Sequence, residues 1–165
     1  MTFQPDRLLE ALERHGVRFV VIGGLAAAIH GAGNVTFDVD VVPEESPANL
    51  GRLSSALTEL EAKVRVDGID GGLPFAHDAR SLAGLNVLNL VTVAGDLDIT
   101  MHPAGVISFE EWDRSASDAE ALGVHFRLAA LEDVIRSKEA ADRPKDRAVL
   151  PLLREVLARR PQPRQ

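Results

Sequence analysis

Hydrophobic and polar positions change their period along the chain, and these changes predict alternating helices and strands. Leucines recur at a helical spacing within residues 5–15, between Pro5 at the start and Gly16 as the stop. The run 18–23 is continuously apolar and rich in β-branched residues, which indicates a buried strand. The small residues of 24–31 then predict a helix that can lie close to a sheet.

The central part of the chain continues this alternation less regularly. Apolar and polar residues alternate over 35–42, which predicts a strand. Residues 46–60 are expected to form a helix with Ser46 as its N-cap. Residues 62–66 indicate another strand, and the glycine-rich segment 67–74 is expected to be a loop.

The C-terminal half adds two strands and three helices to this pattern. Apolar runs over 85–93 and 95–101 predict strands that are separated by a tight turn. A short helix is expected over 108–116, and two longer helices over 129–142 and 144–159. Together the elements predict an α/β (α+β) fold, in which a mixed central sheet is flanked by helices and followed by a helical C-terminal end.

Length and composition are those of one folded domain. The chain has 165 residues, of which 45% are hydrophobic and 26% charged, and proteins of this size bury about 70% of their unfolded surface. We expect a single domain over 1–160 and a disordered tail over 161–165. The absence of cysteine excludes disulfides, thiolate zinc sites and a cysteine nucleophile. There is no signal-peptide pattern and no apolar run near the roughly 20 residues of a membrane helix, so we expect a cytoplasmic protein without a membrane partner.

The charge is spread unevenly along the chain. The net charge of −7 by itself argues against a nucleic-acid partner. Residues 127–165, however, carry ten Lys or Arg against six Asp or Glu, so this end has a charge of +4 and residues 1–126 one of −11. Such an asymmetry can mark a local contact with nucleic acid or phosphate. Taken alone, the asymmetry is better explained by a solvated pair of helices with a basic last turn.

A pair of glycines, Gly23 and Gly24, stands between the first predicted strand and the helix that follows. Two glycines let a ligand approach the backbone closely, and the first turn of a helix offers unpaired N–H groups to an anion. This arrangement suits a phosphate group. Glycines are also common in ordinary strand-to-helix turns, so the pair alone does not establish a site.

Carboxylates recur on two of the predicted strands. Asp38 and Asp40 are two residues apart, so both side chains lie on the same face of their strand and can hold the same metal centre. Mg²⁺ prefers such oxygen ligands together with substrate phosphates. Asp96 and Asp98 form a second pair, in which Asp98 lies between apolar residues and Asp96 adjoins the turn at Gly95. We therefore favour Asp98 as the third carboxylate.

The combination of these motifs resembles the nucleotidyltransferase superfamily, whose signature is Gly-Gly or Gly-Ser, a spacer and Asp-x-Asp. Within it the chain is similar to the AbiEii-type minimal nucleotidyltransferases that are found as bacterial toxins. The segment HGAGNVTFDVD resembles the family pattern HGxxRxTxDxD, and NLVTVAGDLDI resembles NLxTxxGxxDL. The later segment LEDVIRSKEAADRPKDRAVLPLL resembles LEDLIxxKxxxxRxKDxxDLxxL. The resemblance covers about residues 17–153.

The resemblance implies catalytic and metal-binding roles for the glycines and the three aspartates. Gly23 and Gly24 would cradle the triphosphate of a nucleotide. Asp38 and Asp40 would hold the metal, most simply two Mg²⁺ ions, with Mn²⁺ as an alternative. Asp98 would be the third metal-binding carboxylate and would activate the acceptor hydroxyl.

The resemblance also implies a second group of nucleotide-binding residues near the C-terminus. Lys138 would reach the nucleotide phosphates, and Arg143, Lys145 and Asp146 would complete that end of the site. Thr36 matches the family threonine and would form a hydrogen bond near the Asp pair.

Two of these residues have structural alternatives, and one family position differs. Lys138 could instead pair with Asp142 one helical turn later. Asp146 could simply favour the start of the helix that Pro144 opens. Asn34 stands where the family has arginine and supplies no charge, which we interpret as altered substrate handling and not as loss of a metal ligand.

The function implied by the resemblance is Mg²⁺-dependent transfer of NMP from an NTP to an acceptor hydroxyl. The acceptor would be transfer RNA or a protein, as for toxins with a cognate antitoxin, and small-molecule acceptors stay open. One alternative takes DVDVV as a phosphatase motif with Asp38 as nucleophile. It is disfavoured because the residues before Asp38 are less apolar than such a strand requires. A further alternative, supported by Asn34, is a degenerate fold that binds a nucleotide or a partner protein without turnover.

Overall fold

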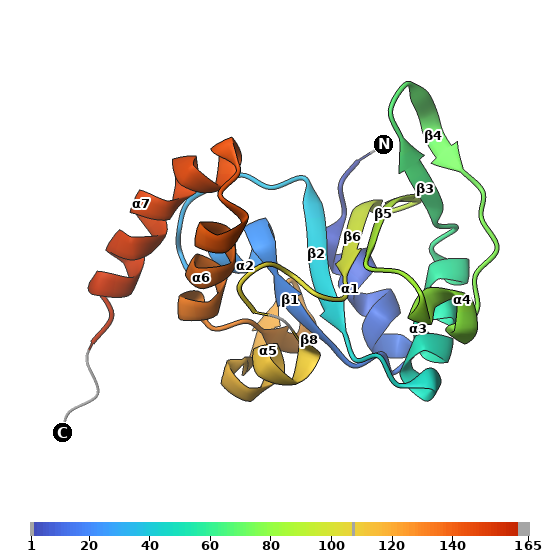
Figure 1. Cartoon of the computed structure of the whole chain (residues 1–165), viewed down its shortest axis with the longest axis horizontal. Coiled ribbons are helices and arrows are strands. Elements are labelled where there is room, and N and C mark those ends of the chain that lie inside the picture. Colours follow the sequence, from blue (N-terminus) through green and yellow to red (C-terminus); the bar gives the residue numbers. More distant parts are fainter. Residues whose placement is uncertain (1, 107, 162–165) are drawn as a thin grey trace.

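An eight-stranded mixed sheet forms the centre of the protein (Figure 1). The computed structural model describes residues 2–106 and 108–161. Its strands are β1 (Phe19–Ile22), β2 (Asp38–Pro43), β3 (Lys63–Val66), β4 (Ile69–Leu73), β5 (Val87–Thr92), β6 (Gly95–Thr100), β7 (Ser117–Ala121) and β8 (Val124–Leu128). Its helices are α1 (Pro5–Arg14), α2 (Gly23–Ile29), α3 (Pro47–Glu59), α4 (Ala79–Ala83), α5 (Phe109–Ser115), α6 (Leu131–Ala141) and α7 (Pro144–Ala158).

The predicted α/β class with a mixed sheet is confirmed. The strand order is β4-β3-β5-β6-β2-β1-β8-β7. β2 is antiparallel to β1 and parallel to β6, while β5 and β6 form an antiparallel hairpin. The predicted elements agree with the observed ones to within a few residues.

The loop predicted over 67–74 is wrong, because β4 forms a hairpin with β3 there. Gly68 has a φ of +79°, the left-handed conformation that a tight turn needs. The glycines of β4 concealed its strand character, and its position at the edge of the sheet leaves most of it exposed. Helix α4 and strands β7 and β8 were not predicted from the sequence either. Of the expected tail, residues 162–165 lie outside the described residues.

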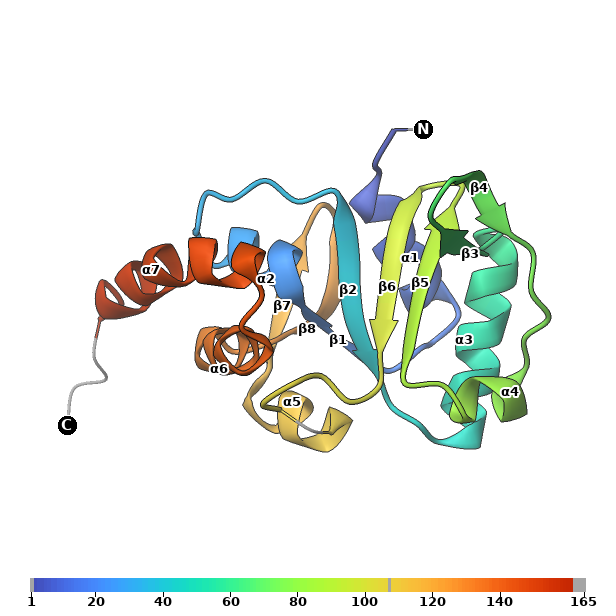
Figure 2. The ribbon, with the colours of Figure 1, turned by 45° about the horizontal axis from the view of Figure 1, so that its top comes forward.

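Helices cover the two faces of the sheet unequally. α1 lies behind β5 and β6 in Figure 2, and α3 packs beside α1. Leu88 and Leu90 of β5 are buried. α2 and α5 contact β1 and β2 instead. Asn89 is exposed and Val87 is 49% exposed, so the opposite face of β5 is open to solvent. The sheet therefore has an open face next to β6.

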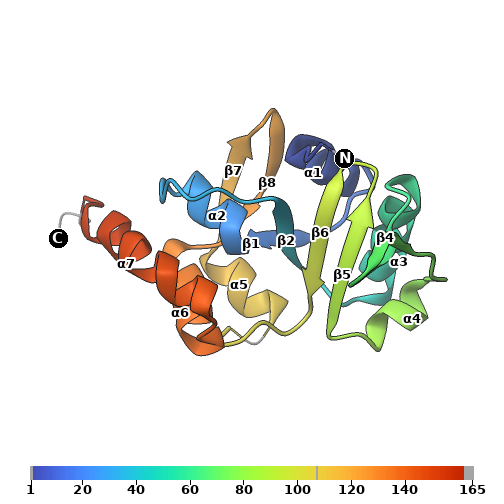
Figure 3. The same ribbon diagram turned by 90° about the horizontal axis from the view of Figure 1, so that it is seen from above.

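The C-terminal helices lie at one end of the molecule. α7 packs on α6 and leads away from the sheet, as Figures 1 and 3 show. Leu150 and Leu153 are the buried side chains of its apolar side. None of the described helices has the length and apolar character that crossing a membrane requires.

Candidate active site

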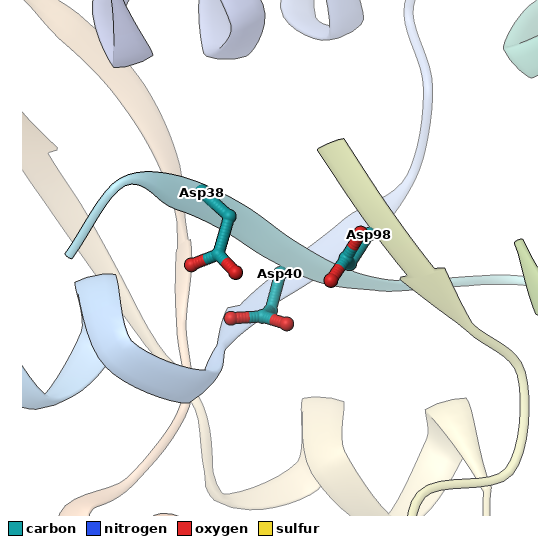
Figure 4. Close-up of side chains that lie close together, drawn as sticks. All are labelled: Asp38, Asp40 and Asp98. Carbon is teal, nitrogen blue, oxygen red and sulfur yellow. The ribbon is translucent and has the colours of Figure 1, made fainter. Parts of the chain in front are cut away.

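Three carboxylates meet where β2 and β6 run side by side. The two strands are parallel, and their register places Asp38 beside Asp96 and Asp40 beside Asp98. Asp38, Asp40 and Asp98 each offer a carboxylate oxygen, and these oxygens lie within 4.8 Å of one another. Figure 4 shows the three side chains directed toward a common space. The structure thus brings together the three aspartates that the sequence singled out, and their roles stay a prediction.

Within the triad of Asp38, Asp40 and Asp98, the negative charge of Asp40 is poorly compensated by the protein. Burial and the neighbouring carboxylates of Asp38 and Asp98 raise the pKa of Asp40 to about 7. The backbone N–H of Gly24 and the charge of Lys145 oppose this shift only in part. A divalent cation would supply the missing charge, and oxygen ligands of this kind suit Mg²⁺. The residues therefore fit the predicted metal.

The glycine pair lets the start of α2 approach this triad. Gly23 has a φ of +65°, and a Cβ atom there would lie 2.2 Å from Oδ2 of Asp40. A Cβ atom on Gly24 would lie 2.9 Å from Oγ1 of Thr36. Both positions therefore need glycine for close packing against the strand that carries the aspartates. The predicted contact with a triphosphate is compatible with this packing and stays a prediction.

Replacing Gly23 by alanine is expected to lower the free energy of unfolding by about 1–3 kcal/mol, because alanine is strained at positive φ and would collide with Asp40. Thermal unfolding followed by circular dichroism measures the change. Gly51→Ala is the matched control, since its Cβ would meet no atom within 4 Å inside α3. That variant should gain up to about 1 kcal/mol. Equal stabilities of the two variants would contradict the packing role.

The loop before β2 is tied both to the triad and to the glycine turn. Oγ1 of Thr36 lies 2.9 Å from Oδ1 of Asp38, which is the hydrogen bond expected near the Asp pair. Nδ2 of Asn34 donates to the carbonyl oxygen of Gly24 at 3.1 Å. Asn34 therefore holds the loop against the turn, in the place where the family pattern has arginine. Its Oδ1 is buried and has no hydrogen-bond partner within residues 2–106 and 108–161.

Asp146 anchors two cations at the junction of α6 and α7. Its carboxylate is fully buried and lies 3.3 Å from Nζ of Lys138 and 2.6 Å from Nε of Arg143. Burial raises the pKa of Asp146, but the hydrogen bond from Arg143 and the charge of Lys138 outweigh burial and hold it below its ordinary value. Lys138 thus pairs with Asp146, and the alternative pairing with Asp142 is wrong because Asp142 pairs with Arg147.

The position of Asp146 also bears on its predicted nucleotide contact. Its carboxylate accepts from the backbone N–H of Arg143 at the start of α7, which fits the structural alternative. Because Asp146 is fully buried, it acts in this conformation through Lys138 and Arg143. This arrangement therefore favours an indirect role for Asp146 over direct contact with a nucleotide.

A cavity of about 730 Å³ joins the triad to the cations. All the predicted site residues except Asp146 line it: Gly23, Gly24, Thr36, Asp38, Asp40, Asp98, Lys138, Arg143 and Lys145. The cavity thus places positive charge on one side of three carboxylates, as binding of a metal-bound polyphosphate would require.

Sequence reasoning missed the residues on the other side of this cavity. Val87 and Asn89 of β5, Thr100 of β6 and His102 line it there. Arg65 of β3 pairs with Asp98 from outside the lining. The alternation in strand β3 indicates which face Arg65 occupies, but the order of the strands, which brings β3 near β6, has no signal in the local pattern.

Comparisons with known proteins bear on the fold. No protein-family model and no curated protein matches the chain. Among solved structures, the lincosamide antibiotic adenylyltransferase LnuA with bound lincomycin superposes with a TM-score of 0.58 at 14% identity, over 94% of this chain and 99% of that one. ANT(2'')-Ia in complex with adenylyl-2''-tobramycin gives a TM-score of 0.57 at 17% identity, over 92% and 86% of the two chains.

A candidate nucleotidyltransferase of Thermotoga maritima gives a TM-score of 0.52 at 16% identity, over 96% of this chain and 97% of that one. None of these three proteins is described as AbiEii-type, so that narrower assignment stays a prediction. Parallel pairing of β2 with β6, the glycine turn before α2 and these similarities agree on one architecture. The chain has the nucleotidyltransferase fold.

Proposed function

We propose that the protein is a Mg²⁺-dependent nucleotidyltransferase that moves NMP from an NTP to an acceptor hydroxyl. The observation that carries this proposal is the convergence of Asp38, Asp40 and Asp98 beside the cations of one cavity. A degenerate fold without turnover would be expected to lack one of these carboxylates. Asn34 was the residue that favoured the degenerate fold, but its side chain has a structural role, because it donates a hydrogen bond to the carbonyl oxygen of Gly24.

The chain's own residues would divide the reaction among them. Lys138, Arg143 and Lys145 would bind the triphosphate charges, and Asp98 would take the proton of the acceptor hydroxyl. The acceptor oxygen then bonds to the α-phosphorus while the bond to the bridging oxygen breaks, and pyrophosphate leaves. Metal ions held by the triad, two Mg²⁺ or Mn²⁺ ions, would supply the charge that stabilises the attacking and leaving oxygens.

The AbiEii-type resemblance favours transfer RNA or a protein as acceptor, with a toxin role, a cognate antitoxin and a cytoplasmic location. Expression in a bacterial host tests the toxin role. Growth should slow with the wild type and stay normal with Asp40→Ala. Equal growth of the two strains would remove the toxin role while leaving the chemistry open.

A small-molecule acceptor is the second candidate, and the charges of α6 and α7 favour it. The arginines of these helices pair with nearby acids and form no free basic stripe; the pairs include Arg136–Asp133, Arg147–Asp142, Arg154–Glu139 and Arg159–Glu155. The +4 charge of this end thus gives weak support to an RNA contact. A cavity of about 730 Å³ is of small-ligand size, and two of the similar structures are described with antibiotics or their adenylyl products.

A labelling experiment tests the activity and separates the acceptors. Each of the four α-labelled NTPs is incubated with the protein, Mg²⁺ and one acceptor class: transfer RNA, total protein, tobramycin or lincomycin. Label should enter at least one acceptor, and EDTA should prevent it. Label in transfer RNA or protein supports the first candidate, and label in an antibiotic supports the second. No label in any mixture would leave only the degenerate fold.

A further inference from the structure

Arg65 joins two aspartates of β6 through one guanidinium group. Its Nη1 donates to Oδ2 of Asp96 at 2.7 Å, and its Nη2 donates to Oδ1 of Asp98 at 2.8 Å. Oδ2 of Asp98 also lies 3.1 Å from Nη2. Arg65 thus contacts both oxygens of Asp98, the third carboxylate of the triad. The predicted metal binding by the triad assigns no role to this arginine.

The sheet explains how Arg65 reaches Asp98 across β5. Asn89 of β5 pairs with Asp98, and Asp98 pairs in turn with Asp40, so these residues form one row across the sheet. Lys63 of β3 pairs with Val91, and Arg65, two residues later, lies on the same face as Lys63. That face is open over β5, so the long side chain of Arg65 can cross it.

The charge of Asp98 depends on its pairing with Arg65, because the carboxylate is largely buried. The Asp98 side chain is only 16% exposed. Burial raises the pKa of Asp98, and the charge and hydrogen bonds of Arg65 are the leading influences that oppose the shift. Asp38 and Asp96 add like charge that acts with burial. Arg65 therefore both orients the Asp98 carboxylate and compensates its charge.

We infer that Arg65 is a positioning residue for the proposed transfer, which holds the Asp98 carboxylate in the orientation that receives the acceptor proton. The inference rests on the proposed function. It assigns the β3–β4 hairpin a part in catalysis, because β3 supplies the group that fixes the third carboxylate. Arg65 itself would contact neither the nucleotide nor the acceptor.

Two substitutions at Arg65 and a matched control test this inference in the labelling assay. Arg65→Gln should lower kcat about 10- to 100-fold, because a misplaced catalytic group costs this much, while KM for the NTP changes less than about twofold. Arg65→Lys should recover part of kcat. Lys63→Gln removes a charge from the same strand and face but leaves Asp98 untouched, and it should keep wild-type kcat. An unchanged kcat in Arg65→Gln, or an equal loss in Lys63→Gln, would overturn the inference.

A double-variant cycle with Asp98→Asn shows whether Arg65 acts through Asp98. Arg65→Gln should lower kcat in the wild-type background and have no further effect in the Asp98→Asn background. In thermal unfolding, Arg65→Gln should lower Tm by about 2–4 °C more in the wild-type background than with Asp98→Asn. Additive effects in both measurements would show that the pair is not coupled.

Failure of this inference can be told apart from failure of the proposed function. No label transfer by the wild type would overturn the proposed function and, with it, the transfer role of Arg65. Label transfer by the wild type together with an unaffected Arg65→Gln would overturn the positioning role alone.

Discussion

Asp40→Asn is expected to abolish nucleotidyl transfer and at the same time to stabilise the metal-free protein at pH 8. The amide keeps the shape of the carboxylate but cannot contribute its charge to metal binding, so transfer should fall at least about 1,000-fold. Stability should rise because the substitution removes one of the three negative charges that lie together in the triad. A loss of activity with a gain of stability is the signature of a functional charge cluster.

The pH dependence of this gain follows from the pKa of Asp40, about 7 in the folded protein against an ordinary value of 3.8. The folded protein therefore binds a proton at Asp40 more tightly than the unfolded chain does. Stability falls as pH rises between about 4 and 7, and the full penalty is present at pH 8. Its upper limit is about 4 kcal/mol, since each pKa unit is worth about 1.4 kcal/mol. The Tm of Asp40→Asn should thus exceed that of the wild type by several degrees at pH 8 and by less than half as much at pH 5.

Thermal unfolding at the two pH values, in EDTA and in Mg²⁺, checks this prediction. Mg²⁺ should raise the Tm of the wild type at pH 8, because it binds the folded state alone, and should have little effect on Asp40→Asn. Asp118→Asn is a control for removal of an acid, since its side chain is 93% exposed. It should change Tm by no more than about 2 °C. A lower Tm for Asp40→Asn at pH 8 would contradict the crowded-charge interpretation.

The sequence was informative about this triad because its parts are local. Asp38 and Asp40 share a strand face by their spacing alone, and the apolar neighbours of Asp98 distinguish it from Asp96. The step that no local pattern contains is the parallel pairing of β2 with β6, which brings Asp98 beside Asp40. The resemblance to the nucleotidyltransferase family, and not the periodicity of the sequence, indicated that Asp98 lies near Asp38 and Asp40.

Most of the elements that were not predicted are short, exposed or rich in glycine; the exception is β8, whose Val124, Phe126 and Leu128 are buried. β4 has exposed residues at most of its positions, and β7 is an edge strand with a polar sequence, so neither has an apolar alternation to detect. Arg65 was missed for a different reason. Its partners lie more than 30 residues away in the chain, and its importance depends on the position of β3 in the sheet.

Asp146 shows that a sequence motif can assign a ligand contact to a residue that is buried behind the ligand-binding residues. The pattern that contains Lys138, Arg143 and Asp146 assigned all of them to the nucleotide, and a sequence cannot separate a residue that contacts a ligand from one that holds such residues. The structure separates them by burial. Lys138 and Arg143 line the cavity, and Asp146 lies fully buried with its carboxylate toward both.

Asp146→Ala is therefore expected to destabilise the protein strongly as well as to impair NTP binding. Removing one partner of a buried ion pair costs about 3–5 kcal/mol, because the remaining charge keeps its desolvation penalty, and Lys138 is only 13% exposed. Tm should fall by about 10 °C. The control is Asp142→Asn, four residues earlier, because asparagine tolerates the left-handed backbone of Asp142 (φ +49°), whose side chain is 67% exposed and pairs with Arg147. That variant should lose less than about 1 kcal/mol.

Asp146→Asn keeps the reaction measurable if the alanine variant does not fold. Its amide can still accept one hydrogen bond but no longer balances two cations, so Lys138 and Arg143 lose the restraint that directs them to the cavity. KM for the NTP should rise about tenfold, while kcat at saturating NTP falls much less, because the triad is untouched. If kcat falls as steeply as in Asp40→Asn with KM unchanged, then Asp146 acts on the transition state. That result would contradict the role proposed for Asp146, which is to hold Lys138 and Arg143 in place for NTP binding.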